Sequence, residues 1–121
     1  MNTYEAVKIQ PENEVQKLPI IGVNTIDRRI YVNGDLRLQF PHEAEDKSWN
    51  IFKPLMTSPQ KIIGTTDFLH ITRDKTWLRD TLEIIGIILT PELQEANIVE
   101  EVVMKNQVVG FRLNAKVSVV K

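Results

Sequence analysis

The sequence predicts a single α+β domain over residues 1–121, built mainly from antiparallel hairpins with one principal helix packed on a sheet. Two observations support this class. Valine and isoleucine contribute 26 residues and alanine only four, and β-branched side chains favour strands. Helical periodicity is clear in one stretch only, so helices are too few to cover both faces of a parallel sheet.

Length and composition restrict the class of protein further. At 121 residues the chain has room for one hydrophobic core. Valine, isoleucine, leucine and phenylalanine make up 40 residues, well above the roughly 20% below which disorder is expected. The net charge of −1 excludes a simple polycation that clamps DNA. The absence of cysteine excludes disulfides, thiolate metal sites and cysteine catalysis.

No targeting or membrane segment is expected. Residues 1–10 mix charged and apolar residues, unlike the basic start and apolar run of a signal peptide. The longest apolar-rich stretch, 84–89, is far shorter than the roughly 20 residues of a transmembrane helix. We therefore expect a cytoplasmic protein that makes no membrane contact.

The clearest local signal in the first third of the chain is a hairpin over residues 25–40. Residues 4–10 are a candidate first strand that Pro11 ends, and residues 19–23 form a short apolar segment. The dipeptide Asn33-Gly34 then stands between two runs of alternating apolar residues. An Asn-Gly pair in this setting is a strong short-range signal for a hairpin.

The register of this hairpin can be chosen from its side chains. A two-residue turn would place Ile30 opposite Arg37 and mix the two faces, whereas a three-residue loop over 32–34 pairs Ile30 with Leu36. The three-residue loop is therefore predicted, with Gly34 left-handed. The expected buried face is Ile26, Ile30, Leu36, Leu38 and Phe40. The expected exposed face is Asp27, Arg29, Tyr31, Asp35, Arg37 and Gln39.

The middle of the chain carries a weaker helix signal and a predicted strand. Within residues 41–56, Trp49, Phe52 and Met56 recur at helical spacing. Pro54 is expected to disrupt this helix or to end it near residue 53. Residues 61–72 are predicted to form a strand. Its expected inward residues are Leu69 and Ile71, with Phe68 and His70 on the other side.

The strongest helix prediction covers residues 74–85. Asp74 can serve as its N-cap, and Leu78, Leu82 and Ile85 share one face. Gly86 is placed where a left-handed residue ends a helix. Residues 87–89 are then expected as a short strand, and residues 90–91 as the start of another helix.

The C-terminus predicts a long strand. Apolar residues alternate without a break from Val109 to Val119, and Lys105-Asn106 is expected to turn the chain back on residues 98–104. Those residues form either a strand or the continuation of a helix, and their β-branched content favours the strand. Residues 107–120 would span about 45 Å when extended, more than the roughly 35 Å diameter of such a domain. The strand must therefore bend, at Gly110 or at Asn114-Ala115, or reach into a partner.

These elements together predict the core. Its expected members are Ile30, Leu38, Leu78, Leu82, Ile85, Phe111, Leu113 and Val117.

No constellation of residues predicts catalysis or metal binding. His42, Glu45 and Asp46 have the spacing of ligands on one helical face, but a structural zinc site needs more histidine or cysteine. A phosphate-binding glycine loop is absent. We therefore expect no metal and no cofactor.

His70 is the one histidine with a plausible catalytic setting. Asp67 is its nearest carboxylate, and the threonines at 65, 66 and 72 match no known nucleophile signature. A protein that is not an enzyme is therefore the expectation.

One polar face suggests a binding site. In the predicted register Arg29 lies opposite Arg37, and two like charges so placed repel. A phosphate between them would relieve the repulsion, and Tyr31 alongside could stack on a base. Asp27 and Asp35 lie diagonal to these arginines, however, so the face can also neutralise itself.

The function predicted first is a protein-interaction or structural module that self-associates through its long C-terminal strand. The alternative is a small protein that binds phosphate or single-stranded nucleic acid at Arg29, Tyr31 and Arg37. A charge asymmetry supports pairing between strands: residues 92–101 are acidic and residues 105–121 basic. Such charges pair either within one hairpin or head to tail between copies, and they also guard an edge against unwanted pairing.

Overall fold

The computed structural model describes residues 18–120. The candidate strand at residues 4–10 lies outside them. The elements are β1 (Ile20–Asn24), β2 (Arg29–Val32), β3 (Asp35–Gln39), α2 (Lys47–Thr57), β4 (Ile63–Gly64), the 3-10 helix η1 (Thr65–Phe68), α3 (Lys75–Leu89), β5 (Val99–Met104), β6 (Gln107–Leu113) and β7 (Lys116–Val119).

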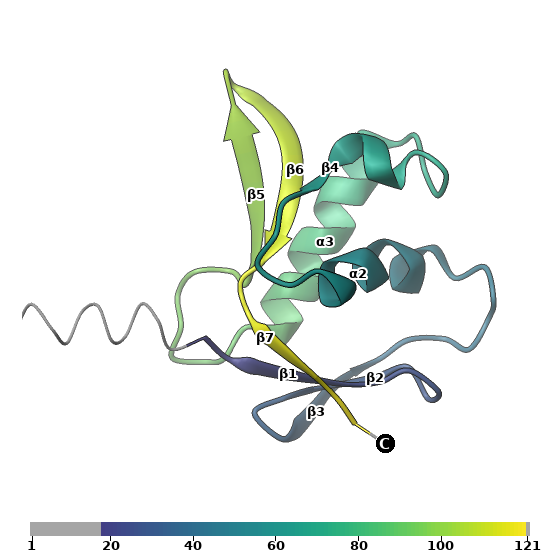
Figure 1. Cartoon of the computed structure of the whole chain (residues 1–121), viewed down its shortest axis with the longest axis vertical. Helices are drawn as coiled ribbons and strands as arrows, with labels where there is room; N and C mark the ends of the chain where they lie inside the picture. The colour runs from purple at the N-terminus through teal and green to yellow at the C-terminus, as the bar shows by residue number, and fades with distance from the viewer. Residues whose placement is uncertain (1–17, 121) are drawn as a thin grey trace, which may run out of the picture.

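The strands form two sheets; helix α3 contacts strands of both sheets, and α2 contacts α3 and β6. One sheet has the order β3-β2-β1-β7 and the other the order β4-β6-β5. All pairs are antiparallel except β1 with β7. The β5–β6 hairpin stands away from the four-stranded sheet, and β7 crosses back to lie along β1 (Figure 1). The predicted α+β class is confirmed.

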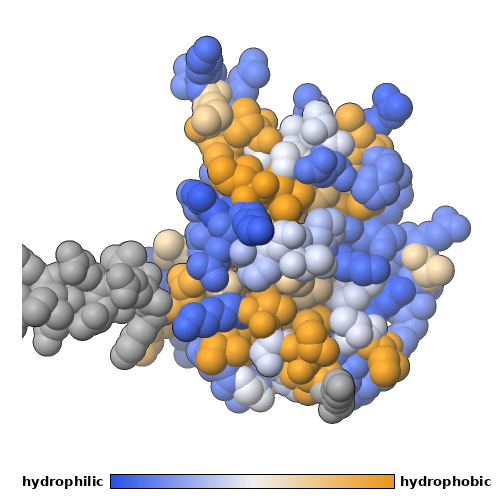
Figure 2. All heavy atoms as spheres, in the orientation of Figure 1, coloured by the Kyte–Doolittle hydropathy of each residue, from blue (hydrophilic) through white to orange (hydrophobic). Residues whose placement is uncertain are grey.

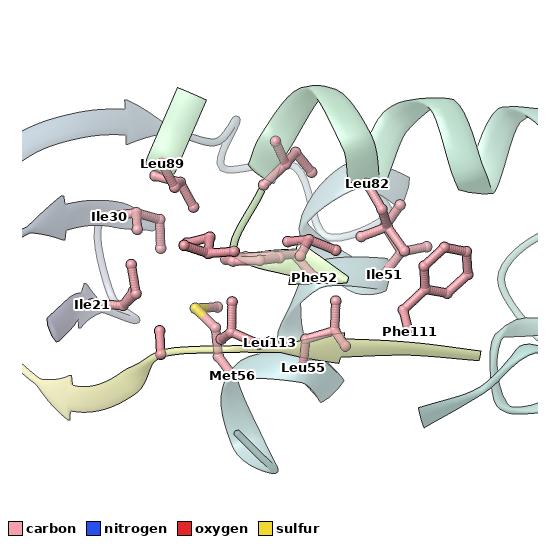
Figure 3. Packing of buried hydrophobic residues seen from close by; sticks show 14 of the residues in the cluster. Ile21, Ile30, Ile51, Phe52, Leu55, Met56, Leu82, Leu89, Phe111 and Leu113 are labelled. Carbon is pink, nitrogen blue, oxygen red and sulfur yellow. The ribbon is translucent and has the colours of Figure 1, made fainter. Parts of the chain in front are cut away.

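One hydrophobic cluster joins both sheets and both helices. Side chains from β1, β2, α2, α3 and β6 point toward one another in its centre (Figure 3). Six of the eight predicted core residues are buried, and Leu38 and Val117 are partly buried against the cluster. Phe40 packs edge-on to Trp49, with ring centroids 5.4 Å apart. Aromatic contacts of this kind add to the area that is buried.

The hairpin over residues 29–39 has a different register from the predicted one. Asn33 and Gly34 both have positive φ, 49° and 94°, as a two-residue hairpin turn requires. Tyr31 pairs with Leu36 and Ile30 with Leu38, so a bulge at Arg37 absorbs the extra residue. Because of the bulge, Ile30 and Leu38 lie opposite each other on the inner face. The predicted three-residue loop was meant to produce such an apolar inner face.

The predicted buried face of this hairpin is therefore partly wrong. Ile30 and Phe40 are buried, but Leu36 is 55% exposed and Ile26 is 83% exposed in the loop between β1 and β2. Val32, which the prediction placed in the loop, is buried. The bulge moves Leu36 to the outer face of the sheet, and a separate turn before β2 removes Ile26 from the strand.

Helix α2 runs through Pro54 and does not end near residue 53. Asp46 caps its start by accepting a hydrogen bond from the Trp49 N–H at 2.8 Å. Pro54 removes only one helical hydrogen bond. The buried side chains of Phe52 and Leu55, on either side of the proline, hold the two halves against the core.

The strand predicted over residues 61–72 is wrong. Only Ile63–Gly64 is extended, and the chain then forms the 3-10 helix η1 and a turn. Phe68 is fully buried against Phe111, whereas Leu69 is 42% exposed. The one-turn helix reverses the faces that a strand would have given, because neighbouring side chains no longer alternate.

Helix α3 begins as predicted and ends later. Asp74 caps it by accepting from the Trp77 N–H at 3.0 Å, and Leu78, Leu82 and Ile85 are buried. The helix continues to Leu89, so Gly86 is an interior residue and residues 87–89 are not a strand. No helix restarts at Thr90 and Pro91; residues 90–97 form turns and a loop.

The long C-terminal strand bends at one of the two predicted points. It divides at Asn114-Ala115 into β6, which pairs with β5, and β7, which pairs with β1. Ala115 is fully buried, and the Asn114 N–H donates to Ile98 O at 2.7 Å. Residues 99–104 are a strand, as their β-branched content favoured, and Lys105 and Asn106 both turn with positive φ.

Candidate interaction site at the edge of the four-stranded sheet

The structure keeps Arg29 and Tyr31 on one face of β2, as predicted, but does not place Arg37 opposite Arg29. Arg29 lies opposite Gln39, not opposite Arg37 as the predicted register required. Its Nη1 is 3.8 Å from Asp27 Oδ2, and its Nε donates to Gln39 Oε1 at 3.4 Å. Tyr31 pairs with Leu36. The repelling pair of arginines, which motivated the predicted site, is absent from the sheet.

Arg37 has a structural partner instead. Its Nη1 donates to Ile88 O, in the last turn of α3, at 3.1 Å. Helix C-terminal carbonyls attract cations because they carry partial negative charge, and α3 has no basic residue in its own last turn. Arg37 therefore ties the edge of the four-stranded sheet to α3.

The predicted catalytic candidates lie beside a cleft. His70 and Asp67 both line a space of about 740 Å³ between α2 and η1, together with Lys47, Asn50 and Lys53 of α2. His70 is exposed. Within residues 18–120, no hydrogen bond joins His70 to Asp67 or to a threonine hydroxyl. The cleft therefore holds charged and polar groups without a pairing of nucleophile and base.

Of the three residues with ligand-like spacing, which were not expected to bind a metal, Asp46 caps helix α2. The Asp46 carboxylate accepts the Trp49 N–H, while His42 and Glu45 are exposed. Among the described residues, no three histidine or carboxylate side chains lie close enough to hold a metal ion.

Within residues 18–120, three of the four sheet edges carry features that hinder pairing with another strand. β3 has a bulge at Arg37, which is also a charged residue at the centre of the strand. β4 is only two residues long. β5 bears Glu100 and Glu101, and its pairing with β6 shifts register between Val102 and Val103. Bulges, short length and charge are the usual devices that protect an edge.

The fourth edge, β7, has none of these devices along its centre. Its register with β1 is continuous from Lys116 to Val119, and Lys116 at its start is its single charged residue. Within the described part of the chain, β7 pairs with β1 alone, so its other side has no partner there. β7 is therefore the sheet edge most open to a further strand.

The backbone shows which residues face outward along this edge. The Lys116 N–H donates to Pro19 O at 2.9 Å and the Val120 N–H to Val23 O at 2.8 Å. Alternate residues of a paired strand direct their backbone groups to opposite sides. Val117 and Val119 therefore direct their N–H and C=O groups away from β1, toward the open edge.

Apolar side chains at the end of β7 are exposed to solvent. Val119 is 64% exposed and Val120 is 37% exposed. Val117 is partly buried against the core cluster. Figure 2 shows hydrophobic surface along the course of β7. A strand added here would satisfy backbone groups and remove apolar surface from water at the same time.

Part of the charge asymmetry of the C-terminal half is paired within the molecule. Glu100 lies opposite Arg112, whose Nη2 is 3.0 Å from Glu100 Oε1. Arg79 Nε lies 4.0 Å from Glu101 Oε2. Glu100 and Glu101, the two acidic residues of β5, thus have basic partners in the same molecule.

Comparison with known proteins gives no match to a family model, to a curated protein or to a solved structure. None of the helices in residues 18–120 is both long and apolar enough to cross a membrane.

Proposed function

We propose that this chain is a non-enzymatic protein-interaction module that self-associates by adding a strand at the open edge of β7. One observation carries the proposal: β7 is the one sheet edge, among those described, that has no bulge, no central charge and more than two residues. Natural proteins protect their edges, so an unprotected edge, at which the backbone groups of Val117 and Val119 face away from β1, is a candidate contact surface.

The bend at Asn114-Ala115 supports this assignment. If β6 continued straight, residues 116–119 would extend beyond the domain and would have no neighbouring strand. The bend instead places β7 on β1, so that the edge is held by a sheet before any partner arrives. A preformed edge lowers the ordering cost of association, because its backbone is already extended.

Sedimentation velocity on the purified full chain tests the proposal. We expect a dimer or larger species at tens of micromolar and a monomer for Val119→Lys, since a lysine at an edge is a common device against strand pairing. A monomeric parent chain would contradict the proposal.

Two matched variants show whether the effect belongs to β7. Val103→Lys adds the same charge at a 52% exposed valine of β5, and Ile87→Lys adds it at a 62% exposed isoleucine of α3. Both should leave self-association unchanged. Loss of association in Ile87→Lys, with Val119→Lys unaffected, would move the contact to the outer face of α3.

The anion-binding alternative has no specific observation in its favour. Its predicted pair, Arg29 and Arg37, is separated by the bulge, and each guanidinium already has a protein partner.

A further inference from the structure

The geometry of β7 points to a closed two-fold dimer, in which β7 pairs antiparallel with β7 of a second copy and Ser118 lies on the symmetry axis. This inference rests on the proposed function and specifies its partner and its register. It also predicts that association stops at two copies.

The partner edge follows from elimination among the edges described. Head-to-tail growth would require β7 of one copy to pair with a different edge of the next. β3 carries a bulge, β4 has two residues, and β5 carries adjacent glutamates and a register shift. β7 of the second copy is the remaining edge. A contact between identical surfaces closes on itself, so it forms a dimer and not a filament.

The direction of pairing follows from symmetry. A two-fold axis perpendicular to the sheet makes the two β7 strands antiparallel. It also leaves the core-facing sides of the two sheets on the same side of the combined sheet. The two four-stranded sheets then become one continuous sheet, whose size lies within the usual range of up to about ten strands.

The register follows from the two residues whose backbone faces outward. Pairing Val117 with Val119 of the second copy uses the N–H and C=O groups of both residues in each chain. If the symmetry axis passed through Val117 or through Val119 instead, the other valine would lie opposite a residue outside β7 of the second copy. The full register places Ser118 opposite Ser118, as a pair without direct backbone hydrogen bonds.

The side chains suit this register. Val117 and Val119 share the face of Ile21 and Val23, which is the buried side of the sheet. Their pairing with the equivalent valines would extend the apolar face across the axis. Ser118 lies on the opposite face beside Gly22. Two serines can approach closely at the axis, where a pair of charged or bulky residues would repel or clash.

Cysteine cross-linking tests the register, because the chain has no cysteine of its own. In Ser118→Cys the two thiols face each other across a non-hydrogen-bonded pair, with Cα atoms about 4.5 Å apart. That separation permits a disulfide. In the control Lys116→Cys, on the same strand and face, the two positions are offset by four residues, or about 13 Å. That offset forbids a disulfide.

We expect Ser118→Cys to form a disulfide-linked dimer under mild oxidation at least about tenfold faster than Lys116→Cys, because only its geometry matches a disulfide. Sedimentation of both reduced variants separates the possible failures. Dimers in which Lys116→Cys cross-links as fast as Ser118→Cys would overturn this register and leave the proposed function intact. Monomers would remove the proposed function and this pairing together. Species larger than a dimer would overturn the closed arrangement.

Discussion

The side chain of Asn97 lies directly against Gly86, in the space that a β-carbon at position 86 would occupy. Asn97 Nδ2 donates to Glu83 O at 3.1 Å, and Asn97 Oδ1 accepts from the Val99 N–H at 2.9 Å. Gly86 therefore lets the loop after α3 dock on the helix and lead directly into β5.

Gly86→Ala should destabilise the protein, although the same change inside an ordinary helix stabilises by up to about 1 kcal/mol. The methyl group would displace Asn97 and weaken both of its hydrogen bonds. We expect a net loss of about 1–3 kcal/mol in the free energy of unfolding, measured by urea denaturation.

A double-mutant cycle with Asn97→Ala isolates the clash. The variant that carries both changes should be no less stable than Asn97→Ala alone, because the methyl group then has room. A Gly86→Ala variant more stable than the parent would show that Asn97 does not restrict this position.

This contact illustrates what the sequence could and could not predict. The start of α3 follows from local chemistry, since Asp74 and the spacing of the leucines lie within a few residues. The role of Gly86 depends on Asn97, which lies outside the helix, so local spacing suggests a helix end instead. Phe68 is a similar case, because its burial depends on Phe111 from a distant strand.

The candidate site was predictable in part. The length of the C-terminal strand required a bend, and Asn114-Ala115 was one of two expected positions. The edge position of β7 was not predictable, because it arises from parallel pairing with β1, which is nearly a whole chain length away. The prediction that Arg29 lies opposite Arg37 was wrong because the hairpin has a two-residue turn and a bulge. The pattern of apolar residues does not distinguish this arrangement from a three-residue loop.

Arg37→Ala should cost more stability than Arg29→Ala. Arg37 donates to Ile88 O at the C-terminal end of α3, where a cation is favourable. Arg29 makes a longer, half-exposed contact with Asp27. We expect a loss of about 1 kcal/mol for Arg37→Ala and below about 0.5 kcal/mol for Arg29→Ala in urea denaturation. Equal losses would contradict the role of Arg37 at the helix end.

The separation of Arg29 from Arg37 also predicts weak or absent binding of nucleic acid. A fluorescein-labelled single-stranded oligonucleotide should show no rise in anisotropy with the parent chain at low salt, where phosphate contacts are strongest. A rise that Arg29→Glu and Arg37→Glu each abolish would restore the nucleic-acid function. The matched charge change Arg73→Glu, at an exposed residue outside the hairpin, controls for net charge.

Glu100 is expected to make the stability of the protein depend on pH in the acid range. The pKa of Glu100 is lowered from its ordinary value of 4.5, mainly by the hydrogen bond from Asn114 and with help from Arg112, against a smaller opposing effect of burial. Asn114 Nδ2 and Arg112 Nε both donate to Glu100 Oε1 at 3.0 Å.

The sign of the pH dependence follows from this lowered pKa. The unfolded chain takes up a proton at Glu100 more readily than the folded chain, so acid favours unfolding. The stabilisation is complete above the unfolded pKa of about 4.5 and is lost as the pH falls through the lower folded pKa.

Glu100→Gln should therefore be less stable than the parent near pH 7, by less than about 1 kcal/mol because the pair is partly exposed to solvent. The difference should shrink as the pH falls below 4.5, the ordinary pKa of this carboxyl group. Urea denaturation across pH 3–7 measures this. Glu101→Gln is the matched control, since the nearest cation to Glu101 lies 4.0 Å away. A difference that stays constant or grows toward low pH would show that Glu100 does not act through its charge.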